Sequence, residues 1–412
     1  MERSFRHNHY VPVWYQKKFL PKGCTQFSYL DLRPDRVRFG ETTYDRHALL
    51  NWGPKRCFAE DDLYTTQWPH SKNTEIEQFF FGLIDREGKA AIEYFADFSL
   101  QNGLHDAFEG LVRYMSVQKL RTPKGLAAFA SFSRITDKNR LLLALQQYAN
   151  LYCATWTDAV WQIVDTGKSN IGFLLSDHPV TLYNRAAFPG SRQCAGPSDP
   201  DIRAVATQTI FPLSSDKALF LTNLAWVRDP YQKPLKIHPN PDLLRTTMFK
   251  ATDIQVGRSL DDDEVLQVNH VIKSRAYRYI AAADREWLYP EKYLASNHWS
   301  KLGDGFLFMP EPRCISMGGT VYVGYDSGRS ESWSEYGHRP WQEEYENKRR
   351  SDREAITLRR FQSEFAARFG PQWRGWAWDY GRNGPPCDDV TRFQKRISGA
   401  AKGTRRSGSS SD

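Results

Sequence analysis

The sequence has few of the patterns that mark disulfide-stabilised and zinc-stabilised proteins. Its 412 residues include six cysteines, and no two of them form a C-x-x-C pair. Neither a zinc ribbon nor a disulfide framework is therefore indicated. We expect the cysteines to be reduced packing residues.

Long hydrophobic runs are also missing. Apolar runs such as residues 141–145 and 171–175 are far shorter than the roughly 20 residues that a membrane-spanning helix needs. The first twenty residues carry charges and histidines where a secretory signal would be apolar. We therefore expect a cytoplasmic protein that is not integral to a membrane.

Lysine and arginine outnumber aspartate and glutamate by 56 to 48, which gives a formal net charge of +8. This excess permits a polyanionic partner such as nucleic acid, although a modest positive charge also serves solubility alone. With 40% hydrophobic residues, the chain has enough apolar surface to form a folded core.

The length exceeds the roughly 250–300 residues at which a single core usually stops growing. We expect a main α+β domain followed by an appendage. The predicted parts are a main domain over 1–300, a β-like connection over 301–325, a linker over 326–340, a basic, aromatic helical extension over 341–394 and a disordered tail over 395–412.

Helical periodicity is clearest in the first half of the chain. Apolar residues recur at steps of three and four over residues 73–98, 105–120 and 137–152, which predicts three successive helices. Residues 261–282 show the same period. A further helix, with a capping-box sequence at its start, is expected to begin near residue 351 and to end before Gly370.

Strand-like patterns surround these helices. Residues 27–32 alternate as in a strand, and two hairpins are predicted, one from 160–164 to 171–175 and one from 209–213 to 218–221. The predicted fold class is α+β, in which a bundle-like helical middle packs on a mainly antiparallel sheet and a helical extension follows.

Several side chains are of the types that hold Mg²⁺ or Mn²⁺ at a phosphodiester site, namely His9, Glu77, Asp85, Glu87 and Asp177. Glu77 and Asp85 are eight residues apart, about 80° around a helix, so both could face one cleft. We assign metal binding to Glu77, Asp85 and Asp177, a ligand or general-base role to His9, and a phosphate contact to Arg121.

Structural roles explain the same residues. Asp177 precedes His178 and Pro179 and suits an Asx turn that ends a strand. The two helical carboxylates suit a solvated helix face, Arg121 suits a helix C-terminus, and a lone histidine such as His9 is more often structural than ligating. No H-E-x-x-H, G-x-S-x-G or glycine-rich phosphate loop occurs to decide the matter.

The extension interleaves tryptophans with arginines. Side chains of these two kinds stack on bases and contact phosphates, which makes it a candidate nucleic-acid surface with Arg349, Arg350, Arg359, Arg360 and Trp376. Alternatively, the tryptophans dock the helix on the main domain and the arginines are only solvated.

Short motifs occur in a definite order. The chain opens with H-x-V-P-x-x-Y-x-x-x-F from His9 to Phe19, and later segments add Ile76-Glu77, Q-x-x-R-T-P over 118–123, S-D-H-P-V over 176–180, F-P-L-S over 211–214, Asn269 and Ala276-Tyr277-Arg278. This order resembles a bacterial family described only as a domain of unknown function. The resemblance covers about residues 9–285, with Gln16-Lys17 where the family commonly has Leu-Arg. It implies a fold and no activity.

The leading functional hypothesis is a metal-dependent phosphodiester hydrolase that acts on nucleic acid, for example in bacterial defence, with Mg²⁺ or Mn²⁺ as cofactor. The alternative is a nucleic-acid-binding or regulatory protein without catalysis. An interaction scaffold is a third reading, and it differs because it predicts no salt-sensitive affinity for nucleic acid.

Overall fold

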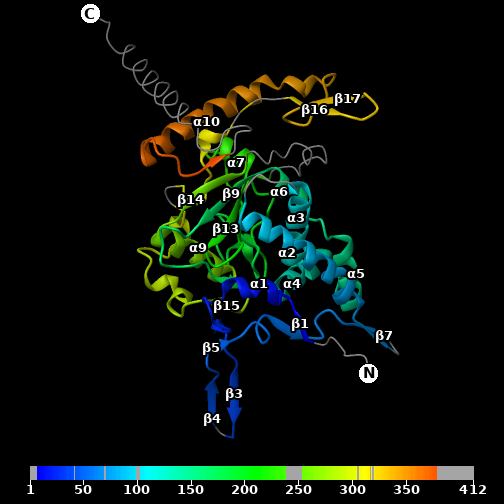
Figure 1. Cartoon of the computed structure of the whole chain (residues 1–412), viewed down its shortest axis with the longest axis vertical. Helices are drawn as coiled ribbons and strands as arrows, with labels where there is room; N and C mark the ends of the chain where they lie inside the picture. The colour runs from blue at the N-terminus through cyan, green and yellow to red at the C-terminus, as the bar shows by residue number, and fades with distance from the viewer. Residues whose placement is uncertain are drawn as a thin grey trace, which may run out of the picture.

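The computed structural model describes residues 7–40, 42–68, 71–98, 103–237, 253–303, 306–315, 317 and 320–377. A six-stranded sheet lies at the centre, with helices on both sides (Figure 1). Its strands, in spatial order, are β11 (Thr181–Tyr183), β12 (Gln208–Pro212), β13 (Lys217–Asn223), β9 (Ala159–Asp165), β14 (Gln255–Ser259) and β18 (Trp376–Ala377). β9 and β14 are parallel, and all other neighbours are antiparallel.

Alternate residues of β13 face two different cores. Leu219 and Leu221 belong to the cluster that contains α2 (Gly82–Ala96) and α3 (Leu104–Arg121), whereas Ala218 and Phe220 belong to the cluster of α9 (Asp262–Arg275). A strand with period-two side chains that is covered on both faces needs apolar residues throughout. Residues 218–221 of β13, which read Ala-Leu-Phe-Leu, meet that requirement.

A second sheet has four antiparallel strands in the order β10 (Leu175–Ser176), β15 (Tyr279–Ala282), β2 (Phe27–Asp31) and β5 (Leu49–Trp52). Four two-stranded pairs complete the β structure: β1 (His7–His9) with β6 (Ala59–Asp61), β3 (Arg36–Phe39) with β4 (Thr42–Asp45), β7 (Thr66–Trp68) with β8 (Ser71–Asn73), and β16 (Thr320–Gly324) with β17 (Ser330–Ser334). The β3–β4 pair projects from one end of the molecule (Figure 1).

Besides short 3-10 turns, the described part of the chain also contains the helices α1 (Val13–Gln16), the π-helix η2 (Ile76–Phe81), α4 (Pro123–Ser133), α5 (Lys138–Gln147), α6 (Cys153–Thr157), α7 (Leu224–Arg228) and α10 (Lys348–Phe369). The α+β class predicted from the sequence is therefore confirmed. In the described part of the chain, no helix combines the length and apolar character needed to cross a membrane.

Close packing of α2 on α3 depends on a glycine. A Cβ atom added at Gly88 would lie 2.3 Å from Cδ2 of Tyr114 on α3. No real side chain accepts that separation, so only glycine allows the Tyr114 ring to rest on the backbone of α2. This contact fixes α3, whose last turn carries the candidate site.

The predicted helices over 73–98, 105–120 and 137–152 are confirmed as η2 with α2, α3 and α5, although α5 ends at Gln147. Pro123 lies just beyond the end of α3 and does not continue that helix. It also begins α4, because its fixed φ suits the first helical position and Thr122 Oγ1 accepts the N–H of Gly125 as an N-cap at 3.1 Å.

The hairpin predicted from 160–164 to 171–175 is wrong. β9 pairs with β13 and β14 instead, and residues 171–174 form no strand. The side chain of Asn269 on α9 makes hydrogen bonds of the kind that a partner strand would make. Its Oδ1 accepts the N–H of Leu174 at 3.0 Å, and its Nδ2 donates to the carbonyl of Gly172 at 2.8 Å. The hairpin formed by β12 and β13 is confirmed.

The helix predicted over residues 261–282 ends early. α9 stops at Arg275, and Tyr279–Ala282 forms β15. The Asp177 carboxylate accepts the backbone N–H groups of Tyr277, Arg278 and Tyr279 at 2.8, 2.6 and 2.8 Å. Those N–H groups are therefore not available to continue the helix.

The C-terminal part of the described chain packs on the rest. Leu358, Phe361 and Phe365 of α10 are buried, and the two phenylalanines join a cluster with Val160 of β9 and Val227 of α7. β18 extends the central sheet beside β14.

The expected linker over 326–340 contains β17, and α10 begins at Lys348 after the N-cap Asn347, three residues before the predicted capping box. Residues 378–412, including the expected disordered tail, lie outside the described residues.

Candidate functional site

Two clusters of buried charged side chains meet where α3 passes into α4. We call the first the Arg121 cluster, which consists of Arg121, Glu77 and Asp85. We call the second the Lys119 cluster, which consists of Lys119, Lys124, His178 and Asp199. The segment 118–124 supplies all the cations of both clusters.

The Arg121 cluster joins η2, α2 and α3. Arg121 is 1% exposed, its Nη2 lies 2.7 Å from Asp85 Oδ1, and its Nε donates to Gln118 Oε1 at 2.7 Å. Gln118 Nε2 in turn donates to the carbonyl of Tyr10 at 2.8 Å. The guanidinium also faces the rings of Phe81 and Tyr114, so Arg121 is held on all sides by protein.

The carboxylates of this cluster outnumber its cation. Burial raises the pKa of Glu77 to about 7, and the effect of burial exceeds the opposing attraction of Arg121. Burial also raises the pKa of Asp85. Among the described residues, Glu77 Oε2 has no hydrogen-bond partner. The Arg121 cluster therefore favours binding a proton near neutral pH.

The structure thus brings together Glu77, Asp85 and Arg121, three of the five predicted site residues. The other two have partners elsewhere. Both oxygens of Asp177 accept backbone N–H groups of residues 277–279, so its role is structural, although it does not form the local Asx turn that was expected. His9 Nε2 lies 3.2 Å from the carbonyl of Lys55, and burial lowers the pKa of His9.

The proposed ligands for Mg²⁺ or Mn²⁺ do not assemble. Within the described ranges, no group of three or more histidine, cysteine, aspartate or glutamate side chains is placed to hold a metal ion. Asp85 is paired with Arg121, and the oxygens of Asp177 are already used by N–H donors. The predicted set of residues therefore does not fit a shared cation.

The Lys119 cluster joins α3, α4 and the segments around residues 178 and 199. Asp199 Oδ2 accepts from Lys119 Nζ at 2.6 Å, and Asp199 Oδ1 accepts from Lys124 Nζ at 2.5 Å. His178 Nε2 lies 3.0 Å from Asp199 Oδ2. Lys124 Nζ also donates to the carbonyl of Arg275 at 2.7 Å. Two ammonium groups therefore share one carboxylate.

Both ring nitrogens of His178 have polar neighbours. Nδ1 lies 2.6 Å from Thr122 Oγ1, which also accepts the N–H of Gly125. Nε2 lies 3.0 Å from Asp199 Oδ2, which accepts, and 3.1 Å from Lys119 Nζ, which donates. Burial, reinforced by Lys119, lowers the pKa of His178 to about 3. His178 is therefore neutral at physiological pH.

Cations outnumber carboxylates in this cluster, and this imbalance affects the pKa values of its members. Although burial opposes it, attraction by Lys119 and Lys124 holds the pKa of Asp199 well below its usual range. Burial lowers the pKa of Lys119, since its ammonium group has lost solvation. Counted by formal charge, with each lysine +1, Asp199 −1 and His178 neutral, these four side chains carry one unit of excess positive charge.

A pocket opens beside the Lys119 cluster. Its volume is about 510 Å³, within the range of small-molecule sites. Lys119, Lys124, His178 and Asp199 line it, together with apolar side chains such as Phe129 and further polar ones such as Thr155 and Gln193. The cluster is thus buried within the protein and still borders a cavity.

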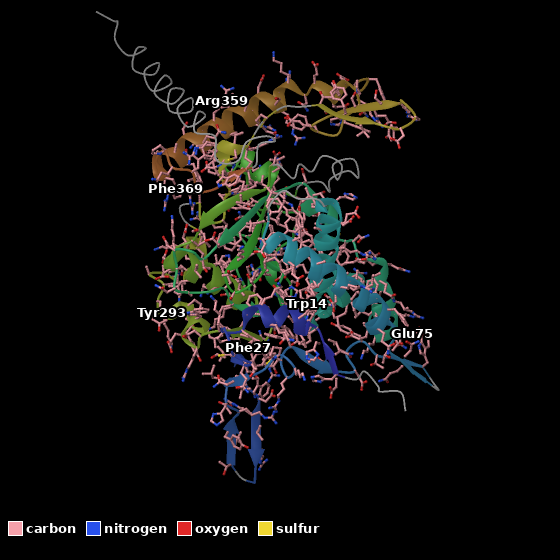
Figure 2. All side chains as sticks on the ribbon, in the orientation of Figure 1. Trp14, Phe27, Glu75, Tyr293, Arg359 and Phe369 are labelled. Carbon is pink, nitrogen blue, oxygen red and sulfur yellow. The ribbon has the colours of Figure 1, made fainter. Side chains whose placement is uncertain are left out.

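The predicted nucleic-acid residues separate into two groups. Arg349 and Arg359 are exposed on α10, and Figure 2 shows Arg359 at the end of the molecule farthest from the β3–β4 pair. By contrast, Arg350 pairs with Glu354 at 2.8 Å, Arg360 pairs with Glu364 at 2.9 Å, and Trp376 is packed in β18 against Gly257.

The sequence reasoning missed Lys119, Lys124 and Asp199. Lys119 lies inside the Q-x-x-R-T-P segment and Lys124 follows it, so the motif pointed to the correct turn but not to these side chains. Asp199 lies in a loop, where no periodicity indicates burial. His178 was noted only as the neighbour of Asp177.

Comparison with known protein families gives a match over part of the chain. Residues 137–286 match the model of a family described as protein of unknown function (DUF4238). The resemblance predicted from the motifs, to a family of unknown function, is confirmed at that level. The DUF4238 match includes His178 and Asp199 and begins after α3 and α4, which supply both lysines. No curated protein and no solved structure matches the chain.

Proposed function

We propose that this protein binds a phosphate-bearing ligand in the pocket beside the Lys119 cluster. The observation that carries the proposal is the pair of buried ammonium groups that share one carboxylate at the edge of a cavity. A buried charge without a full counter-charge is costly, and an anion in the pocket would supply the missing one. Lysine ammonium groups are common phosphate ligands.

Hydrogen-bond capacity supports the same conclusion. An ammonium group has three N–H donors. Lys124 Nζ donates to Asp199 and to the carbonyl of Arg275, which leaves one donor without a partner in the described part of the protein. Since Lys124 lines the pocket, that donor is placed to meet an anionic oxygen.

A nucleophilic enzyme of the Ser-His-Asp type is the competing reading, because Thr122, His178 and Asp199 form a hydroxyl, imidazole and carboxylate chain. Two features argue against it. Thr122 is fully buried and caps α4, so its oxygen cannot reach a substrate. With a pKa of about 3, His178 is too weak a base to activate a hydroxyl.

Calorimetric titration of the full chain with pyrophosphate tests the proposal. We expect binding by the wild type and at least about tenfold weaker binding by Lys124→Met, since one of two ammonium groups is removed. Lys89→Met, on the exposed face of α2, is the matched control and should bind as the wild type does. Equal affinity in all three proteins would contradict the proposal.

A second candidate function is nucleic-acid binding by α10. The supporting observation is that α10 buries its apolar face while Arg349, Arg353 and Arg359 stay exposed, without a carboxylate partner among the described residues. The arginines are therefore not needed for docking. A membrane surface is less suitable, because no apolar face of α10 is left to insert.

Salt dependence tests this second function. Fluorescence anisotropy with single-stranded and duplex oligonucleotides should show an affinity that falls with salt. Replacing Arg349, Arg353 and Arg359 by alanine should reduce the slope of log K against log salt by about one unit for each phosphate group that the variant no longer binds. The exposed pair Arg86→Ala/Lys89→Ala on α2 is the control. An unchanged slope in the triple variant would exclude this surface.

Hydrolysis of phosphodiester bonds is the third part of the proposal, since a phosphate-binding pocket is compatible with it. Incubation of labelled DNA and RNA with the protein and Mg²⁺ or Mn²⁺ tests it directly. Cleavage that is abolished in Lys124→Met and retained in Lys89→Met would place the reaction at the pocket. No cleavage by the wild type across a broad substrate panel would leave a binding protein.

A further inference from the structure

We infer that the phosphate-bearing ligand is a nucleotide, with its phosphate at the Lys119 cluster and its base against the outer wall of the pocket. This inference rests on the proposed function and names the chemical class of its ligand. It follows from how charge, apolar surface and hydrogen-bonding groups are distributed around the cavity.

The charged residues of the pocket lining differ in burial and pairing. The excess positive charge lies with Lys119 and Lys124, which are 5% and 6% exposed. Arg203 also lines the pocket, is far more exposed, and is neutralised by a two-point ion pair with Asp201, at 3.1 and 2.7 Å. The phosphate is therefore drawn to the buried lysines, and the uncharged part of the ligand extends toward the rim.

The rim offers apolar surface suited to a flat ring. Phe132 lines the pocket with 80% of its surface exposed, and Leu151 lines it with 41% exposed. Phe129 also lines the pocket and is buried, with its ring 5.5 Å from that of Tyr148. An exposed aromatic ring at the mouth of a cavity is a stacking platform, because every nucleobase has an apolar face.

Polar groups among these apolar side chains distinguish a base from an alkyl chain. The pocket is also lined by Thr155, Gln193 and Ser198. An acyl chain bound there would cover these groups without giving them hydrogen bonds, which is unfavourable. A heteroaromatic base and its sugar present apolar faces and polar edges together. The mixed lining therefore favours a nucleotide over a phospholipid.

Calorimetry with a graded set of probes tests the inference on the full chain. The probes are inorganic phosphate, ribose 5-phosphate, adenosine 5′-monophosphate and octyl phosphate. We expect the nucleotide to bind roughly tenfold or more tightly than ribose 5-phosphate, which is the usual contribution of stacking one base. Phe132→Ala should remove that difference and leave the affinity for inorganic phosphate unchanged.

The chain offers a matched control for this variant. Phe79 of η2 is 70% exposed and does not line the pocket, so Phe79→Ala should keep the preference for the nucleotide. Equal binding of ribose 5-phosphate and the nucleotide, or tighter binding of octyl phosphate, would overturn the nucleotide inference and leave phosphate binding intact. If none of the four probes binds, the proposed function itself fails.

Discussion

The Arg121 cluster and the Lys119 cluster use neighbouring residues of one segment in opposite ways. In the first, one guanidinium faces two carboxylates, and Arg121 is enclosed by protein. In the second, two ammonium groups face one carboxylate, and the group borders a cavity. The excess charge is therefore negative at one site and positive at the other.

This difference determines what each cluster can bind. A buried excess carboxylate is neutralised most simply by a proton, and Glu77, with a pKa raised to about 7, follows that rule. A lysine can release a proton, but an open pocket also admits an anion. The sign of the excess and the presence of a cavity together make the Lys119 cluster the better ligand site.

The largest expected effect is a difference in how much the carboxylates of the two clusters contribute to the unfolding free energy. Asp199→Asn leaves two buried ammonium groups without a carboxylate and should cost about 3–5 kcal/mol of unfolding free energy. Asp85→Asn should cost roughly 1 kcal/mol, because Glu77 still faces Arg121. Urea denaturation at neutral pH measures both free energies.

The double variant Asp199→Asn/Lys124→Met serves as the control for this comparison, since it removes one charge of each sign. It should recover part of the stability that Asp199→Asn loses. Equal losses in Asp199→Asn and Asp85→Asn would show that the charge ratio does not distinguish the clusters.

The next effect depends on pH. The pKa of Glu77 is about 7 in the folded chain against an ordinary value of 4.5. The folded state therefore holds an extra proton between these values, and its stability falls as pH rises from 4.5 to 7. Glu77→Gln should stabilise the protein by up to about 3 kcal/mol at pH 8 and change little at pH 4.5. Thermal and urea unfolding at both pH values measure this, and a stabilisation independent of pH would contradict it.

The sequence predicted the Arg121 cluster better than the Lys119 cluster, for a physical reason. Asp85 and Arg121 lie on α2 and α3, whose sequences show clear 3.6-residue periodicity, so their approach follows from two amphipathic helices packing together. Asp199 and the backbone around His178 lie in irregular segments whose path is set by long-range contacts. One such contact is the hydrogen bonding of Asn269 to residues 172–174, and local pattern gives no sign of it.

The same limit explains the errors in the fold that was predicted from the sequence. The apolar run over residues 171–175 has the composition of a strand, and its burial is real, since Phe173 and Leu174 are 0% exposed. Residues 171–174 are not paired with a strand, although Leu175 begins β10, and strand pairing is a tertiary property. Likewise, Asp177 was identified as a turn former or a metal ligand, but its three N–H donors come from residues 100 to 102 positions later.

The smallest expected effect concerns His178. Its pKa is lowered to about 3, so the unfolded chain binds its proton first as pH falls below 6.5, and this group destabilises the fold progressively from there toward pH 3. Nitrogen NMR of the folded protein at pH 5 should show a neutral ring. A charged ring at pH 5 would contradict a pKa that burial and Lys119 lower to about 3.

The central claim, that the excess positive charge of the Lys119 cluster binds a phosphate group, is tested most directly by a crystal structure of the full chain with pyrophosphate. The account predicts a phosphate oxygen within hydrogen-bond distance of Lys124 Nζ and close to Lys119 Nζ, with the Asp199 ion pairs retained. A pocket without the anion, in a protein that binds pyrophosphate in solution, would contradict the claim.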